Sequence, residues 1–325
     1  MSPPEFWSDP DDVLARVLEP VGRIVGAVTT WRAARSPRDI APIPVVSVGG
    51  VTVGGAGKTP VAAAIADALI DLGARPAIVM RGYGGRLTAP TRVDPQTHTA
   101  ADVGDEALMH APHHPTYIAR RRVEAARLAA HDGLTVAVLD DGHQHPGLRK
   151  DVSLVVIDGA DPFGNGYCVP AGPLREAPRD ALSRADAVVL VGDDVSGLRA
   201  RLPEGLQVLR ARLVPDAGAE SLRGRAVVAF AGLARPDKFF RTLEEIGAQV
   251  VARYGFEDHH PYTDADIQPI LDQAFRFGAV PVTTAKDAVK LAPDQRQQVD
   301  VVGVRAVFDA PDALSALLRR VLPGR

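Results

Sequence analysis

The sequence predicts an α/β fold in which helices flank a parallel sheet. Residues 44–48 form an apolar run typical of a buried strand, a glycine-rich turn follows, and residues 60–72 have the composition of a helix. Further apolar runs alternate with helical segments, at 77–80, 135–139, 154–158 and 187–191. Strands that are apolar on both faces and alternate with helices are typical of a parallel sheet.

The turn after the first strand has the sequence of a phosphate-binding loop: Thr52, Val53, Gly54, Gly55, Ala56, Gly57, Lys58 and Thr59. Such a turn presents backbone N–H groups and a helix N-terminus to an anion. Lys58 can reach the β- and γ-phosphates of a nucleotide, and the Thr59 hydroxyl can hold Mg²⁺. Thr52 stands where the common pattern has glycine. The segment predicts a P-loop NTPase-like domain that binds a nucleoside triphosphate, rather than a turn without a ligand.

Length and composition restrict the class of protein. A chain of 325 residues is long enough for two domains, and a net charge of −3 gives no electrostatic case for nucleic acid. The one cysteine, Cys168, excludes a disulfide framework and a cysteine-based zinc site. No apolar run approaches the roughly 20 residues that span a bilayer, and no signal peptide is evident. We therefore expect the catalytic body to stay in the cytoplasm.

The pattern divides the chain into three parts. Residues 1–38 form an amphipathic helical segment, residues 39–214 the P-loop domain, and residues 215–325 a smaller α/β domain. A small and polar stretch at 215–225 marks the expected hinge. The second domain is predicted from strands at 227–232, 249–252 and 280–284 and helices at 236–246 and 264–277.

The N-terminal segment carries an apolar stripe from Val13 to Trp31 at three- and four-residue spacing, with arginines from Arg16 to Arg38 along and after it. One interpretation is a helix at a membrane surface with its arginines near anionic lipid. The other is a helix packed on the body of the protein. A stripe alone does not distinguish lipid from protein core.

Several polar residues follow strands or open helices, where α/β sheets bind ligands. Asp140 and Asp141 close an apolar strand and, with Thr59, predict a Mg²⁺ site. Asp105 opens a helix, either as a cap or as the group that accepts a hydroxyl proton. Gln144 and His145 are expected to hydrogen-bond substrate or phosphate.

In the second domain, Asp258 and His259 form a pair able to relay a proton, and Lys286 ends a strand as a potential phosphate clamp. By contrast, three histidines lie among prolines and alanine, and we expect them to be loop residues without a ligand: His110, His113 and His114.

Short motifs follow one another between residues 42 and 290: the loop 52–60, Arg81-Gly82-Tyr83-Gly84-Gly85, Gly104-Asp105-Glu106, Asp140-Asp141-Gly142-His143-Gln144-His145, Pro170-Ala171-Gly172-Pro173-Leu174-Arg175-Glu176, Ala231-Gly232-Leu233-Ala234-Arg235-Pro236, Asp258-His259-His260 and Thr284-Ala285-Lys286-Asp287. Together they resemble the tetraacyldisaccharide 4′-kinases, the lipid A 4′-kinases of Gram-negative bacteria, whose loop also carries threonine at the position of Thr52. The sequence departs from that pattern at Gly50, His143 and Ala285.

The resemblance implies a two-domain P-loop kinase that uses MgATP to phosphorylate the 4′-hydroxyl of a tetraacylated glucosamine disaccharide 1-phosphate, which gives lipid IVA. It implies an N-terminal helix that associates with the cytoplasmic face of the inner membrane, and we expect a peripheral monomer. Because the substrate is a lipid, it favours the membrane interpretation of the helix.

Carried over residue by residue, the resemblance places Lys58 and Thr59 on phosphate and Mg²⁺, and Asp140 and Asp141 on the metal-binding acids. Asp105 falls on the catalytic base and His259 on the histidine that assists it. Three further residues are implied to contact substrate or phosphate: Gln144, Arg175 and Lys286.

Two alternatives stay open. A P-loop GTPase-like maturation factor would deliver metal through its histidines, and Thr284-Ala285-Lys286-Asp287 is close to a guanine-specificity element. A cytosolic small-molecule kinase or ligase is the other, and it would need neither detergent nor lipid for activity.

Overall fold

The computed structural model describes residues 4–35 and 39–322. Within them the larger sheet has nine strands in the order β13-β8-β7-β6-β1-β5-β2-β4-β3. All neighbours from β8 to β4 are parallel, and the edge strands β13 and β3 are antiparallel. The strands are β1 (Val45–Gly50), β2 (Pro76–Met80), β3 (Thr91–Arg92), β4 (Thr116–Ile118), β5 (Val136–Leu139), β6 (Val152–Asp158), β7 (Ala187–Val191), β8 (Gln207–Pro215) and β13 (Val304–Phe308). The predicted parallel sheet is confirmed.

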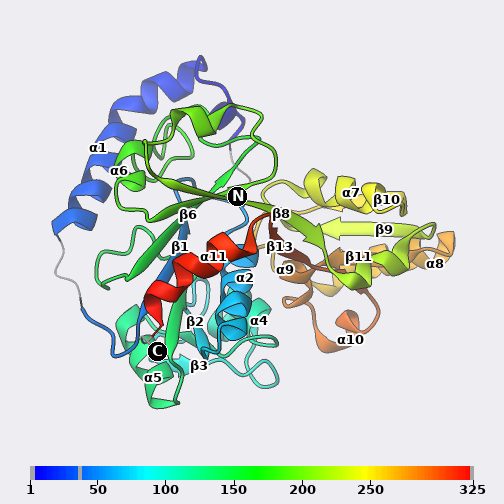
Figure 1. Ribbon diagram of the computed structural model, residues 1–325. Coiled ribbons are helices and arrows are strands. Elements are labelled where there is room, and N and C mark those ends of the chain that lie inside the picture. The colour runs from blue at the N-terminus through cyan, green and yellow to red at the C-terminus, as the bar shows by residue number, and fades with distance from the viewer. Residues whose placement is uncertain (1–3, 36–38, 323–325) are drawn as a thin grey trace.

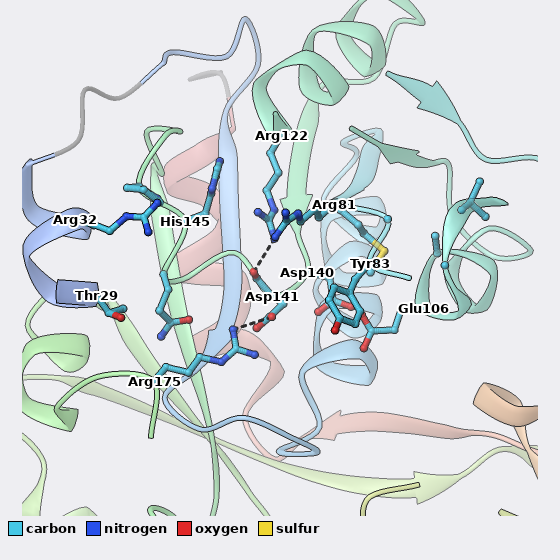
Figure 2. A pocket seen from close by; sticks show the side chains of 17 residues that line it. Thr29, Arg32, Arg81, Tyr83, Glu106, Arg122, Asp140, Asp141, His145 and Arg175 are labelled. Atoms are coloured by element: carbon cyan, nitrogen blue, oxygen red, sulfur yellow. Dashed lines mark hydrogen bonds and ion pairs between the residues drawn. The ribbon is translucent and has the colours of Figure 1, made fainter. Parts of the chain in front are cut away.

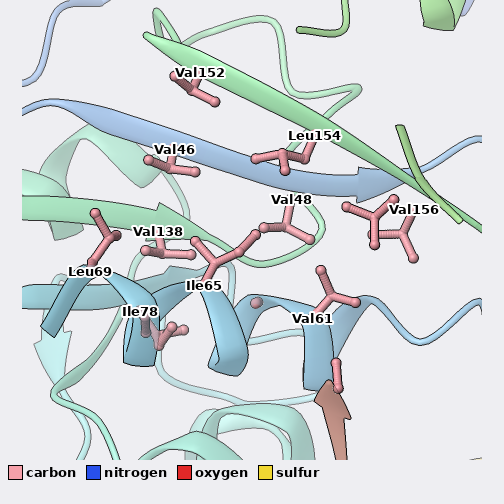
Figure 3. Packing of buried hydrophobic residues seen from close by; sticks show 14 of the residues in the cluster. Val46, Val48, Val61, Ile65, Leu69, Ile78, Val138, Val152, Leu154 and Val156 are labelled. Atoms are coloured by element: carbon pink, nitrogen blue, oxygen red, sulfur yellow. The ribbon is translucent and has the colours of Figure 1, made fainter. Parts of the chain in front are cut away.

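Helices cover both faces of this sheet (Figure 1). On one face α2 (Lys58–Asp71) lies with α11 (Pro311–Leu318), and on the other lies α5 (Arg122–His131). Alternate residues of β1 serve the two cores, because Val46 and Val48 pack under α2 while Val45 packs with α5 (Figure 3). Burial on both faces is the reason why these strands are apolar runs rather than alternating ones.

The second sheet is a separate four-stranded parallel unit beside the first (Figure 1). Its order is β10-β9-β11-β12, from β9 (Ala226–Ala231), β10 (Gln249–Gly255), β11 (Val280–Thr284) and β12 (Asp300–Val302). The helices of this unit are α7 (Pro236–Glu245), α8 (Asp264–Phe277), α9 (Ala285–Ala288) and α10 (Pro293–Arg296).

The chain returns to the larger sheet after β12. β13 pairs with β8, and α11 packs against α2. The second domain was predicted to extend from residue 215 to residue 325, but its last strand is β12. The chain after Gly303 belongs to the larger domain, because the short strand β13 adds to the edge of β8. The expected hinge contains a short 3₁₀ helix, Ala217–Leu222.

The N-terminal helix α1 (Val13–Arg35) lies along one side of the larger domain, next to α6 (Pro178–Leu182) (Figure 1). Its buried residues are small: Ala15, Gly22, Gly26 and Ala33. The large apolar residues point outward, with Val17 67% and Ile24 65% exposed. Arg38 and residues 36–37 lie outside the described residues. No helix among those described is both long and apolar enough to cross a membrane.

Candidate functional site

A cavity of about 480 Å³ opens at the carboxyl ends of the central strands. Its walls come from the ends of β2 and β5, from the short helix α4 (Asp105–His110), from the start of α5 and from α1 (Figure 2). The lining includes Thr29, Arg32, Arg81, Tyr83, Glu106, Arg122, Asp140, Asp141, Gln144, His145 and Arg175. Sequence reasoning placed five of these at the site: Asp140, Asp141, Gln144, His145 and Arg175.

The P-loop joins β1 to α2, as predicted, and it borders the cavity at Asp141. Gly54 and Gly57 have φ angles of 107° and 84°, a region that glycine adopts without strain. The Lys58 ammonium donates to the Gly54 carbonyl at 2.9 Å and lies 4.0 Å from the Asp141 carboxylate. Burial lowers the pKa of Lys58, which the charges of Asp141 and Asp140 oppose. Thr59 follows in the first turn of α2.

Asp140 and Asp141 follow β5, next to the P-loop strand β1. Asp141 has φ 52°, and its carboxylate pairs with Arg175 at 2.9 Å while its carbonyl accepts from Arg122 at 3.0 Å. Burial disfavours the ionised form of Asp141, but the charges of Arg175 and Lys58 outweigh it, so its pKa is lowered. A left-handed backbone at a non-glycine residue is typical of a functional site.

The donor set at this position fits Mg²⁺. The Asp141 Oδ1 atom is buried and has no hydrogen-bond partner, so one carboxylate oxygen is free to serve as a ligand. Across the described residues, no group of three or more histidine, cysteine, aspartate or glutamate side chains is arranged to hold a metal ion. Mg²⁺ is usually bound by one or two carboxylates together with nucleotide phosphates and waters.

A second cluster joins the two domains. The His259 Nδ1–H donates to the Asp105 carboxylate at 2.8 Å, and Lys286 donates to Asp258 at 2.7 Å while lying 3.3 Å from His259 Nε2. Asp105 opens α4 in the larger domain, whereas His259 follows β10 in the smaller one. His259 has φ 60°, so both described non-glycine residues with a left-handed backbone, Asp141 and His259, belong to the site.

Protonation in this cluster follows from its contacts. Burial of Asp105 favours the neutral acid, but the hydrogen bond from His259 and the charge of Lys286 outweigh it, so the pKa of Asp105 is lowered. The hydrogen bond to Asp105 raises the pKa of His259, although partial burial and Lys286 oppose this. Beside them, burial and the charges of Asp140 and Asp105 raise the pKa of Glu106 to about 7.

The cavity has an acidic end and a basic end. Glu106 and Asp140 lie near Tyr83 at the acidic end, and Arg32 lies beside His145 at the basic end (Figure 2). Asp141 lies between the two ends, in contact with Arg122 and Arg175. His145 lies at the basic end, where burial and the charges of Arg122 and Lys150 lower its pKa to about 4. A neutral His145 among arginines can accept or donate a hydrogen bond without adding charge.

Gln144 bridges the cavity wall to the P-loop strand. Its amide donates to the Gly50 carbonyl at 2.8 Å and to Glu176 at 3.2 Å. The neighbouring His143 is buried, bonded to Ser153 and Ala181, and burial lowers its pKa to about 3. His143 is therefore a neutral core residue.

The prediction of loop residues was wrong for His110, which is buried at the end of α4 and whose Nε2–H donates to Asp140 at 3.0 Å. His114 lies in the turn after α4, as predicted, but it pairs with Asp67 at 2.9 Å. The partners are distant in sequence, so the local composition gave no sign of them. Arg32 and Arg122 were likewise not predicted as site residues, since each stands in a helix without a motif.

The structure argues against the guanine-specificity element, because its aspartate, Asp287, is already bound within the protein. Asp287 is fully buried, accepts from the Gly232 amide at 3.0 Å and from the Thr284 hydroxyl at 2.7 Å, and forms an ion pair with Lys290 at 2.7 Å. These contacts tie β9 to α9, so the Asp287 carboxylate holds the smaller domain together and is not available to a nucleotide base.

Comparisons with known proteins agree with this geometry. The family model for tetraacyldisaccharide-1-P 4′-kinase matches residues 14–323. Proteins named tetraacyldisaccharide 4′-kinase from Rhodospirillum rubrum and Rhodospirillum centenum are 54% and 48% identical to this chain, covering 100% of it and 99% and 98% of the relatives. A crystal structure of LpxK from Aquifex aeolicus in complex with ATP has a TM-score of 0.78 at 26% identity, covering 96% of this chain and 100% of that one. The chain belongs to the tetraacyldisaccharide 4′-kinase family.

Proposed function

We propose that this protein transfers the γ-phosphate of ATP to the 4′-hydroxyl of a tetraacylated glucosamine disaccharide 1-phosphate, giving lipid IVA in lipid A biosynthesis. The observation that carries the proposal is the set of charged groups around Asp141. Asp141 lies 4.0 Å from Lys58 of the P-loop, and the arginines that line the same cavity suit an anionic sugar phosphate. The names of the relatives supply the acceptor.

The P-loop binds the phosphoryl donor. Its backbone amides and the Lys58 ammonium neutralise the β- and γ-phosphates. Thr59, Asp140 and Asp141 would hold Mg²⁺, which when bound neutralises charge that develops between the phosphates. His110 keeps the Asp140 carboxylate in a fixed orientation.

Asp105 accepts the proton. The 4′-oxygen bonds to the γ-phosphorus, the bond from that phosphorus to the β,γ-bridging oxygen breaks, and the hydroxyl proton passes to the Asp105 carboxylate. With its lowered pKa, Asp105 is ionised at neutral pH but is a weak base. That suits a loose transition state, in which the attacking oxygen gains little bonding early. His259 orients the carboxylate and shares the proton.

The acceptor reaches this site from a membrane surface. The face of α1 opposite the protein carries Val13, Val17, Val21, Ile24, Val28 and Trp31, each between 47% and 76% exposed. An exposed apolar face next to arginines is the pattern of an interfacial helix. Arg32 on the same helix lines the basic end of the cavity, so the acyl chains would stay in lipid while the sugars enter.

The partners and location follow from that arrangement. We propose peripheral association with the cytoplasmic face of the inner membrane, where ATP and the lipid precursor meet, and no nucleic-acid partner. A monomer remains a prediction.

The test is transfer of ³²P from γ-labelled ATP to tetraacyl disaccharide 1-phosphate in detergent with Mg²⁺, for wild type and Lys58→Ala. Loss of one cation from a phosphate site is expected to lower transfer by about 10²-fold or more. A labelled glycolipid from wild type with strong loss in the variant supports the proposal. Absence of lipid product from folded wild-type enzyme would reject it.

A further inference from the structure

Helix α1 is docked on a segment that also builds the site. We call residues 164–176 the docking segment. A Cβ at Gly22 would lie 2.5 Å from the Cys168 carbonyl oxygen, and a Cβ at Gly26 would lie 2.7 Å from Cys168 Sγ. The approach is so close that only glycine fits at Gly22, where the neighbour is backbone. Upstream of α1, Trp7 Nε1–H donates to Pro170 at 3.1 Å.

The docking segment continues directly into the cavity. Its last two residues are Arg175, which pairs with Asp141, and Glu176. The segment also pairs with the entry to the P-loop, because Val53 N–H donates to the Pro173 carbonyl at 2.8 Å and Arg175 N–H donates to Val51 at 2.8 Å. One stretch of chain thus contacts α1 on one side and the phosphate site on the other.

Glu176 completes this connection. Its side chain is fully buried and accepts two hydrogen bonds of 2.6 Å from Arg184. It also accepts from the Gln144 amide at 3.2 Å and from the Thr30 hydroxyl of α1 at 3.4 Å. Both oxygens of this buried carboxylate accept from one nitrogen, Arg184 Nη2, which holds the carboxylate in one orientation. Glu176 in turn fixes the side chains that donate to it.

We propose that α1 is a structural wall of the acceptor pocket, whose docking through Gly22 and Gly26 positions Arg175 directly and Gln144 through Glu176. Thr29 and Arg32 supply the part of the wall that α1 itself contributes (Figure 2). The helix thereby acts on acceptor geometry independently of its affinity for lipid. This inference rests on the acceptor proposed above.

The experiment separates docking from membrane binding with two matched leucines. Gly22→Leu adds bulk to the docked face, and Ala27→Leu adds similar apolar bulk to an exposed position of the same helix. Each full-length variant is assayed for kcat/KM towards the tetraacyl disaccharide 1-phosphate, KM for ATP, thermal unfolding, and binding to phosphatidylethanolamine–phosphatidylglycerol vesicles. Gly22→Ala, with a single added carbon, is measured as the milder variant where leucine prevents folding.

A displacement of about 1 Å at a reacting group can cost up to about 10²-fold in rate. We expect kcat/KM for the acceptor to fall by about tenfold in the Gly22 variant and to stay within about twofold in Ala27→Leu. Vesicle binding is not expected to fall in either variant, and KM for ATP should be unchanged because β1 and α2 hold the P-loop in the core.

Equal acceptor kinetics in the two variants would overturn the inference. A fall in kcat/KM for the acceptor that parallels a fall in vesicle binding would also overturn it, because a simple membrane anchor gives that result. So would a fall that parallels a rise in KM for ATP, because a general loss of structure gives that result. Inactivity of wild type would instead reject the proposed acceptor.

Discussion

The pair of Asp105 and His259 gives the sharpest test of the catalytic assignment. Asp105→Asn keeps the volume and one acceptor oxygen for His259 but removes the carboxylate, and His259→Asn keeps an N–H donor near the position of Nδ1. Both variants should fold, because each retains a hydrogen bond across the 2.8 Å contact. The change therefore falls on proton transfer rather than on packing.

The expected magnitude comes from proton transfer by a positioned group, which contributes about 10²- to 10⁴-fold, or about 3 to 5.5 kcal/mol of activation free energy. We expect kcat to fall by about 10³-fold in Asp105→Asn and less in His259→Asn. Because the two residues share one hydrogen bond, the double variant should lose little more than Asp105→Asn alone.

The assay is steady-state ³²P transfer to the acceptor, with ATP binding measured separately by calorimetry and expected to be unchanged. His260→Asn, at the next residue and bonded to Asp266 outside the cluster, serves as the matched control. Wild-type kcat in Asp105→Asn would refute its role as proton acceptor. Losses that multiply in the double variant would show that the two residues act separately.

Three further predictions follow from charge and exposure. Lys286→Met removes a cation that lowers the pKa of both Asp105 and His259. The acid limb of the pH profile of kcat/KM should therefore move to higher pH, and an unchanged acid limb would contradict this. His110→Asn breaks the buried bond to Asp140, and the Mg²⁺ concentration for half-maximal activity should rise about tenfold, with weaker Mn²⁺ binding by electron paramagnetic resonance. Ile24→Asp should weaken vesicle flotation while changing the free energy of unfolding by no more than about 0.5 kcal/mol; unchanged flotation would argue against the anchor.

Local sequence was sufficient for the longer strands that are buried on both faces, but not for the three-residue β4. Val46, Val138 and Val156 belong to apolar runs because helices cover the sheet on either side, and those runs were recognised. The signal failed for β8, whose alternation leaves Arg210 and Arg212 exposed near the edge of the sheet. It failed again for β13, a short strand whose pairing with β8 depends on a contact between distant parts of the chain.

The site shows the same limit. Lys58 and Asp141 could be paired in advance because a P-loop and a strand-end acid occupy neighbouring strands of a parallel sheet. The places of Arg32 and His110 in the site could not be predicted. They depend on how α1 and α4 pack, and the spacing of residues along the chain does not indicate that packing. The apolar stripe of α1 was visible, but which face it would turn to solvent was decided by Gly22 and Gly26.

The proposed catalytic pair is complete only where the two domains meet, since Asp105 and His259 come from different domains. Two further ion pairs join the same domains: Lys238 pairs with Asp158 at 2.8 Å and Arg235 with Asp161 at 2.5 Å, all partly exposed. Exposed ion pairs contribute about 0 to 1 kcal/mol each, so they favour the closed arrangement without locking it. A contact of that strength allows reopening for product release. We expect the pair to form only when the domains close, so that bound ATP does not meet a complete catalytic site while water still has access, which would limit hydrolysis without an acceptor.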